Sequence, residues 1–333
     1  MPDSTRFLRR GARHPGTACY NPGLLGEKAF AMSNQAVSSH SSDIRRRLTI
    51  DRYNSVLSRL PSRRQESLAD PRSADAEIWN VFRTLAQLDP AIWLPGLLAL
   101  GRIRKTPGAS ELSAGIGLTL WKRVKPPAER LAWLQQRALR GALRPPVGAR
   151  RKGRVIPLSE LRDELKSRAR GRLPLEEPVE VDAIVKCPHC VLFVEIPRPE
   201  KSPDEPAASD AGRTYLLRLI DAGISYAECR SRIQKGPVGF SLLILPLSEE
   251  SREPWARALR ALTGSPARLR RSLPHRGASF DPSSLEGRLG VGSWPATRDL
   301  LSDLRRRVSD PFEVALLERL LRQGIPAATR AAL

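Results

Sequence analysis

The chain has 333 residues, of which 41% are hydrophobic and 27% charged, so it carries enough apolar material for a folded core and is not a wholly disordered chain. Its formal net charge of +21 favours a polyanionic partner. We expect nucleic acid, with DNA favoured over RNA; the alternative is an ordinary protein with an Arg-rich face. No apolar run approaches the roughly 20 residues of a membrane span, and the start lacks the apolar stretch of a secretory signal, so we expect a cytoplasmic protein with no membrane partner.

The first half of the chain divides into two predicted regions. Residues 1–70 are rich in Ser, Arg, Gly and Pro, and we expect a mostly disordered basic segment with a short helix near residues 51–60. Residues 73–150 are predicted to be a basic helical region. Its expected helices begin near Ser73 and at Asp89-Pro90, and cover residues 111–121 and 127–143.

A basic Pro/Gly segment, RPPVGARRKGR, follows at residues 144–154. It could lie along a phosphate backbone or be a solvated hinge. The candidate phosphate contacts are Arg150, Arg151, Lys152 and Arg154. The next predicted helix, over residues 157–170, carries Glu160 and Glu164 four residues apart on one face.

Residues 155–250 are predicted to form an α/β core. Apolar runs predict strands at residues 179–185, 191–196 and 240–245, and residues 212–234 read as a helix with a break at Gly223. Strand, turn, strand, helix, strand in this order predicts a mixed sheet flanked by helices. The net charge of the sequence changes sign near residue 172. Residues 122–172 hold sixteen Lys and Arg and four Asp and Glu, whereas residues 173–212 hold three Lys and Arg and nine Asp and Glu. A site that binds phosphate through metal ions needs both signs close together.

Residues 251–333 are predicted to close the chain with helices and one basic loop. The helices are expected at residues 253–262, 297–308 and 311–323, with Asp310 capping the last. Residues 263–292 show little periodicity and are expected to be a basic loop.

Asp182 in VEVDAIV and Glu195 in LFVEIP lie 13 residues apart, near the ends of two adjacent predicted strands. In this order of elements they resemble the PD-(D/E)XK nuclease superfamily, which places an Asp on one strand and Glu-x-Lys on the next. The resemblance covers about residues 157–247. It implies a restriction-endonuclease-like fold and a Mg²⁺-dependent endonuclease or exonuclease with Asp182 and Glu195 as metal ligands. It further implies a contribution from Glu160 or Glu164 and a substrate contact from Arg213.

The chain departs from this family at one position. The Lys expected two residues after Glu195 is Pro197, which carries no charge to balance a transition state. Lys201, Arg198 or Lys186 could supply the charge instead, with Lys201 our candidate. The alternative is a catalytically inactive nucleic-acid-binding or assembly protein. Under plain strand alternation, Asp182 and Glu195 would be outward-facing acids on a half-wet sheet.

Cys187-Pro188-His189-Cys190 joins the first two predicted strands of the core. A CxxC turn is half of a tetrahedral zinc site, and Cys229 or a His could complete it. A structural zinc ion held by Cys187 and Cys190 is therefore one hypothesis. The interpretation that we favour is a tight hairpin turn with two ordinary cysteines.

Overall fold

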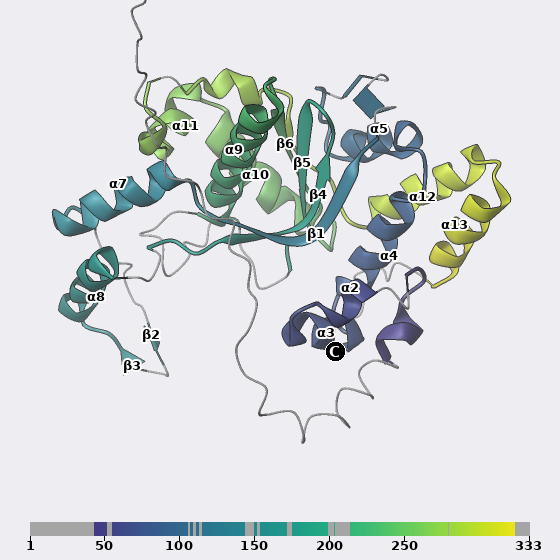
Figure 1. Ribbon diagram of the computed structural model, residues 1–333, viewed down its shortest axis with the longest axis horizontal. Coiled ribbons are helices and arrows are strands. Elements are labelled where there is room, and N and C mark those ends of the chain that lie inside the picture. The colour runs from purple at the N-terminus through teal and green to yellow at the C-terminus, as the bar shows by residue number, and fades with distance from the viewer. Residues whose placement is uncertain are drawn as a thin grey trace, which may run out of the picture.

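The computed structural model describes residues 43–51, 55–105, 107–108, 111–112, 115–143, 150–151, 154–171, 175–198, 203, 214–278 and 280–323. Its centre is a five-stranded mixed sheet in the order β1-β4-β5-β6-β7 (Figure 1). The strands are β1 (Gly117–Val124), β4 (Val179–Lys186), β5 (Cys190–Glu195), β6 (Gly239–Ile244) and β7 (Leu289–Val291). The protein is therefore an α/β protein, as the sequence predicted.

Strand directions follow from the connections. β1, β4 and β5 pair antiparallel, and the short turn from Lys186 to Cys190 makes β4 and β5 a hairpin. β6 is parallel to β5 and β7 is parallel to β6. Parallel neighbours need a crossover, which α9 (Tyr215–Gln234) supplies between β5 and β6. The three core strands predicted from the sequence are confirmed within one residue at each end.

Helices cover both faces of the sheet, which explains why every residue of β5 is buried. On one face the strands pack on α4 (Asp75–Leu85), α5 (Pro90–Leu100), α12 (Ala296–Arg307) and α13 (Pro311–Gln323). On the other face they pack on α9, α10 (Arg252–Thr263) and α11 (Pro266–Ser272). Continuous apolar strands such as β5 are what a two-sided core requires.

The predicted helix caps are confirmed at two places. Asp89 is the N-cap of α5 and accepts a 2.9 Å hydrogen bond from the Ala91 amide. Asp310 accepts from the amide of Phe312 at 2.8 Å, at the start of α13. Asp-Pro at a helix start supplies both the cap acceptor and a first residue that needs no partner for its nitrogen.

The largest error of the sequence prediction is β1. Residues 111–121 were expected to be helical, but the strand begins at Gly117 and pairs along β4 from Gly117↔Lys186 to Val124↔Val179. Gly115 has a φ of +83°, which ends any local helix, and Trp121 stacks on Trp79 of α4 at 5.8 Å. Residues 73–150 are thus not an independent helical region, because β1 is an edge strand of the central sheet.

Two further predictions differ from the structure. Residues 263–292, expected to be a loop, contain α11, the 3₁₀ turns Pro274–Arg276 and Pro282–Leu285, and β7. α9 runs unbroken through Gly223, where a break was expected. A Cβ at Gly223 would lie 2.0 Å from the Phe240 ring, so the glycine makes room for helix-on-strand packing.

The N-terminal residues up to 42 lie outside the described part of the chain, so their expected disorder is untested. Residues 43–70 are helical in part, with α2 (Ser55–Ser58) and α3 (Ser62–Ala69). Ile44, Leu48 and Leu68 form a small core with Trp79 and Trp121. These few apolar residues order a segment whose composition suggested disorder.

Between β1 and β4 the chain leaves the sheet as α7 (Ala128–Leu139), a small hairpin of β2 (Arg150–Arg151) and β3 (Arg154–Val155), and α8 (Leu158–Arg170). α7 and α8 pack side by side and stand at one end of the molecule (Figure 1). We call residues 128–171 the α7–α8 arm. None of the described helices is long and apolar enough to cross a membrane.

Candidate functional site

The two acids of the resemblance meet at one end of the β4–β5 hairpin. The register of the hairpin ends at the pair Ala183↔Val194, and Asp182 and Glu195 are the next residue on each strand. Both are buried, with exposures of 6% for Asp182 and 0% for Glu195. Buried acids are not what plain strand alternation on a half-wet sheet predicts.

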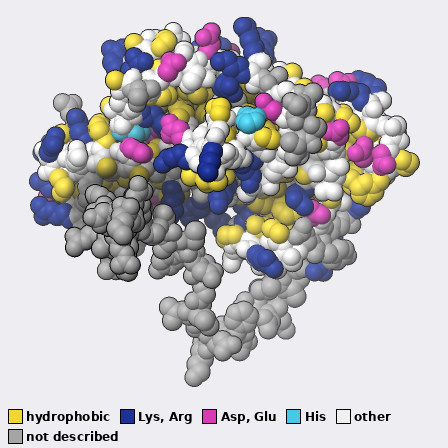
Figure 2. All heavy atoms as spheres, turned by 45° about the horizontal axis from the view of Figure 1, so that its top comes forward, with side chains coloured by type: hydrophobic (Ala, Val, Ile, Leu, Met, Phe, Trp, Pro, Cys, Tyr) yellow, Lys and Arg dark blue, Asp and Glu magenta, His cyan; other side chains and the backbone are white. Residues whose placement is uncertain are grey.

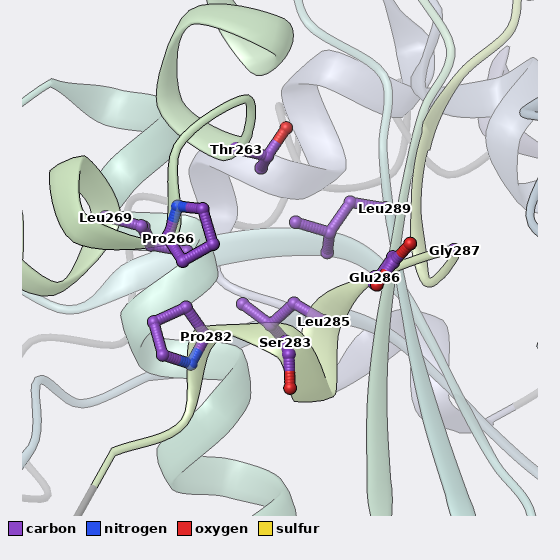
Figure 3. Close-up of a pocket in the computed structure, with 9 residues that line it drawn as sticks. All are labelled: Thr263, Pro266, Leu269, Pro282, Ser283, Leu285, Glu286, Gly287 and Leu289. Atoms are coloured by element: carbon purple, nitrogen blue, oxygen red, sulfur yellow. The ribbon is translucent and has the colours of Figure 1, made fainter.

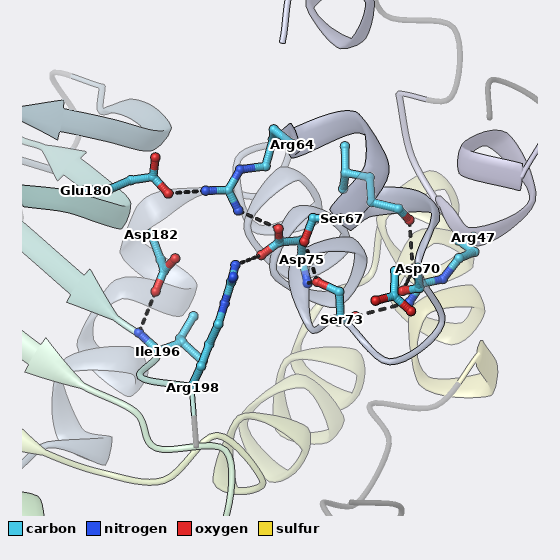
Figure 4. A network of polar contacts seen from close by, with 11 residues as sticks. Arg47, Arg64, Ser67, Asp70, Ser73, Asp75, Glu180, Asp182, Ile196 and Arg198 are labelled. Atoms are coloured by element: carbon cyan, nitrogen blue, oxygen red, sulfur yellow. Dashed lines mark hydrogen bonds and ion pairs between the residues drawn. The ribbon is translucent and has the colours of Figure 1, made fainter. Parts of the chain in front are cut away.

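Asp182 is fixed by the backbone of the neighbouring strand. Its Oδ2 accepts a 2.8 Å hydrogen bond from the amide of Ile196, the residue after Glu195 (Figure 4). The Asp182 side chain thus accepts from a backbone amide just after the end of β5, in place of a backbone carbonyl of the neighbouring strand. The carboxylate of Asp182 and the backbone next to Glu195 are held together by this bond.

Glu195 is fixed from the helix above. The hydroxyl of Tyr215, in the first turn of α9, donates to Glu195 Oε1 at 2.7 Å. Burial raises the pKa of Tyr215 well above its usual value, and the charges of Glu195 and then Asp182 raise it further. The hydrogen bond therefore fixes the direction of the Glu195 carboxylate from α9. Tyr215 was not predicted as a site residue.

An ion-pair cluster lies beside the acid pair and was also missed. Asp75, at the start of α4 and fully buried, pairs with Arg64 of α3 and with Arg198, whose Nη2 is 2.6 Å from Asp75 Oδ1. Arg64 also pairs with Glu180 of β4 and lies over the ring of Trp121. Glu180 is two residues from Asp182, so the two project from the same side of the strand (Figure 4). Two guanidinium groups thus stand next to the acids.

The three candidates for the missing Lys have different outcomes. Arg198 belongs to the cluster just described. Lys186 ends β4 four residues from Asp182, roughly 13 Å away at about 3.3 Å per residue, so the structure does not bring it to the acids. Lys201 lies outside the described residues and remains a prediction.

Glu160 and Glu164 do not join the acid pair in this structure. Both are on α8, which packs against α7 and stands apart from the sheet (Figure 1). Glu164 pairs with Arg168 on the same helix at 2.9 Å, and Glu160 is exposed. The four-residue spacing that suggested a ligand pair reflects a solvated helix face. The acid that does lie near the site from a preceding helix is Asp75.

The predicted phosphate contacts are placed only in part. Arg150, Arg151 and Arg154 lie on the β2–β3 hairpin of the arm, on a different part of the molecule from the acid pair. Lys152 and Arg213 lie outside the described residues.

The segment Cys187–Cys190 forms the tight turn of the β4–β5 hairpin. Cys187 and Cys190 are buried, and the Cys187 amide donates to the Cys190 carbonyl at 2.8 Å. Burial raises the pKa of the Cys187 thiol to about 12 and also raises that of Cys190. Cys229 and His189 are exposed. The zinc hypothesis remains a prediction, and the turn's contribution to the apolar core is what the structure describes.

Two carboxylates are oxygen donors of the kind that a hard cation binds. Within the described ranges, no three His, Cys, Asp or Glu side chains gather as a metal-binding group. Mg²⁺, however, often binds through one or two carboxylates, with waters and substrate phosphates completing its shell. Asp182, Glu195 and the carbonyl of Ile196 would supply the protein oxygens.

A separate hollow of about 370 Å³ lies beside the edge strand β7, between that strand and α11 (Figure 3). It is lined by Thr263, Pro266, Leu269, Pro282, Ser283, Leu285, Glu286, Gly287 and Leu289. Its walls contain one carboxylate and no cation, so it offers little to a phosphate.

Comparisons with protein-family models, curated proteins and solved structures found no match to this chain.

Proposed function

We propose that the protein binds nucleic acid and hydrolyses its phosphodiester bonds with Mg²⁺, as the resemblance to PD-(D/E)XK nucleases implies. The observation that carries this proposal is the acid pair. Asp182 and Glu195 are both buried at one end of the β4–β5 hairpin, where Asp182 accepts a hydrogen bond from the amide of the residue after Glu195 and Tyr215 donates one to Glu195. Burying two carboxylates near one another is costly unless their charge is compensated, and a bound cation would compensate it.

The order of elements supports the same proposal. The family's strand, turn, strand, helix, strand appears as β4, β5, α9 and β6, with β6 parallel to β5. The acid pair stands where β5 and β6 end, since Glu195 pairs with Ile244 in the register. Ligands of α/β sheets commonly bind beyond the carboxyl ends of parallel strands.

In this proposal each residue of the site has its own role. When bound, Mg²⁺ polarises a phosphate oxygen and lowers the pKa of a water. Asp182 and Glu195 would hold the cation, while the Ile196 amide orients Asp182 and Tyr215 orients Glu195. Arg198 and Arg64 bring positive charge to the edge of the site, where a phosphate would need it.

A second function is favoured by a specific observation. Pro197 replaces the family's Lys, and the two cations at the site edge, Arg64 and Arg198, both pair with Asp75. A protein that keeps the fold and binds nucleic acid without cutting it would show this arrangement. Lys201 is the residue that decides between the two, because a Lys supplied from that position would restore the missing charge.

The test is cleavage of a panel of single-stranded and duplex DNA and RNA with Mg²⁺ or Mn²⁺. We expect metal-dependent cutting that is lost on Glu195→Gln and on Lys201→Ala. Glu180→Gln, which changes a partly exposed acid two residues from Asp182, should keep most activity. Salt-sensitive binding without cutting of any substrate would favour the second function, and absence of binding would refute both.

A further inference from the structure

The α7–α8 arm has a small apolar core of its own. Leu134 and Ala138 of α7 pack on Ala169 of α8 and on Leu175, which follows the arm. Gln135 Nε2 donates to the Ala169 carbonyl at 3.0 Å and ties the two helices together. The described helices α7 and α8 are therefore held against one another in one arrangement.

A buried ion pair anchors the arm to the sheet. Arg130 of α7 donates to Glu176 Oε2 at 2.9 Å, with exposures of 4% and 2%. Arg218 of α9 lies 3.8 Å from Oε1 of the same Glu176 and is also buried. Because α9 also positions Tyr215, the arm and the acid pair are attached to the same helix. Their relative placement is thus set by the fold.

The outer side of α8 carries a stripe of cations. Arg162, Lys166 and Arg170 are exposed and four residues apart, so they lie on one side of the helix. Lys166 and Arg170 also line a shallow hollow with Asp163, Ser167 and Gly171, and Asp163 is the acid on this side of α8. Glu160 and Glu164 lie on the opposite side, where Glu164 holds Arg168.

More positive charge lies on the neighbouring elements of the arm. Arg137 and Arg140 are exposed at the end of α7. Figure 2 shows Lys and Arg side chains scattered among hydrophobic, acidic and other side chains over the face that it draws. An excess of exposed cations over acids on one part of a surface is typical of contact with a polyanion.

We propose that the Arg162, Lys166 and Arg170 stripe binds the phosphate backbone of duplex nucleic acid, away from the acid pair. This inference rests on the proposed nucleic-acid partner and adds a place of contact that the sequence did not predict. The three cations span about 12 Å of helix axis at 1.5 Å per residue. Over that length one strand of a duplex presents roughly three to four phosphates, which matches the number of cations. Contacts of this kind read no base sequence.

The test compares two triple variants with the same change of charge. One replaces Arg162, Lys166 and Arg170 by Ala. The control replaces Arg298, Arg307 and Arg322, exposed cations of α12 and α13 at the other end of the molecule, by Ala. Binding of a fluorescent 25-base-pair duplex is measured by anisotropy from 50 to 300 mM salt, and folding of each variant is checked by thermal unfolding.

We expect the stripe variant to bind roughly 10- to 100-fold more weakly at low salt, with a salt slope smaller by about 2 to 3, and the control to match the wild type within a factor of about three. Equal losses in both variants would mean a general charge effect and overturn the inference. So would no loss in either, or a wild type that binds anionic lipid vesicles and not the duplex. The stripe result is separable from catalysis, because a non-cutting protein can still show it, and a cutting protein with an unchanged salt slope would contradict the stripe alone.

Discussion

The hydroxyl of Tyr215 donates a 2.7 Å hydrogen bond to the buried carboxylate of Glu195, so α9 holds the acid that ends β5. The two residues are 20 apart in sequence, separated by the segment that includes Lys201. The helix that crosses from β5 to β6 therefore also shapes the candidate site. This hydrogen bond fixes the direction in which the Glu195 carboxylate points.

Tyr215→Phe should destabilise the fold, because it removes a donor from a buried acceptor. We expect a loss of about 1–3 kcal/mol in the free energy of unfolding, measured by urea denaturation. Tyr226→Phe is the matched control, since it keeps the edge-on ring contact of Tyr226 with Phe193 at 5.7 Å. A Tyr215→Phe protein as stable as the control would show that the bond contributes nothing.

The pH dependence of stability should depend on Glu77. Burial raises the pKa of this carboxyl from its ordinary 4.5 to about 7, against the smaller opposing effects of the Trp294 hydrogen bond and Arg47. Between pH 4.5 and 7 the folded state holds a proton that the unfolded state releases, so this contribution is complete below pH 4.5 and is lost as the pH rises through 7. Glu77→Gln should remove the loss.

The measurement is the free energy of unfolding at pH 5 and at pH 8. The difference between the two should be smaller in Glu77→Gln than in the wild type, by on the order of 1–2 kcal/mol after allowing for partial solvent exposure. Glu129→Gln, at an exposed position of α7, should leave the difference unchanged. An identical pH dependence in all three proteins would contradict the assignment.

Gly223 should tolerate no side chain. A Cβ there would lie 2.0 to 2.7 Å from three atoms of the Phe240 ring, so α9 and β6 would have to separate. We expect Gly223→Ala to cost about 1–3 kcal/mol of stability. A Cβ at Gly236 would meet nothing within 4 Å, so Gly236→Ala should leave the stability unchanged. Thermal unfolding of both variants and the wild type measures the two effects. Equal melting temperatures for the two variants would refute this packing.

Asp75→Asn should destabilise the protein more than an ordinary broken ion pair. Asp75 is fully buried and joins Arg64 to Arg198, so the change leaves two guanidinium groups without their shared carboxylate. The expected cost is about 2–4 kcal/mol. Asp303→Asn breaks an exposed pair with Arg306 on α12 and should cost less than about 0.5 kcal/mol. Similar costs for both would show that burial of the Asp75 cluster adds nothing.

Local signals predicted much of the fold. The apolar runs of β4, β5 and β6 and the Asp-Pro caps of α5 and α13 are statements about neighbouring residues, and the structure has all of them. β1 was missed because the apolar residues of Gly117–Val124 follow a stretch with helical character, and only pairing with β4 makes them a strand. Strand formation depends on a partner that periodicity does not identify.

The candidate site was predicted only where it lies within one hairpin. Asp182 and Glu195 are 13 residues apart, and a turn suffices to bring them together. Arg198 and Asp75 are 123 residues apart, and nothing in either local sequence indicates the pair. Glu160 and Glu164 were chosen by helical spacing, which is shared by any solvated helix, and the fold places them on the arm. Long-range charge pairing is a property of the folded chain.

The most direct test of the acid pair measures cleavage and binding together. Asp182→Asn and Glu195→Gln keep the shape of each side chain and remove its charge, and Glu180→Gln serves as the nearby control. On the best substrate of the panel, with Mg²⁺ or Mn²⁺, single-turnover cleavage should fall at least 100-fold in both site variants while the Kd for the same substrate changes less than about threefold. Cleavage that persists in both folded site variants, or a wild type that binds but never cuts, would contradict a catalytic role for the pair.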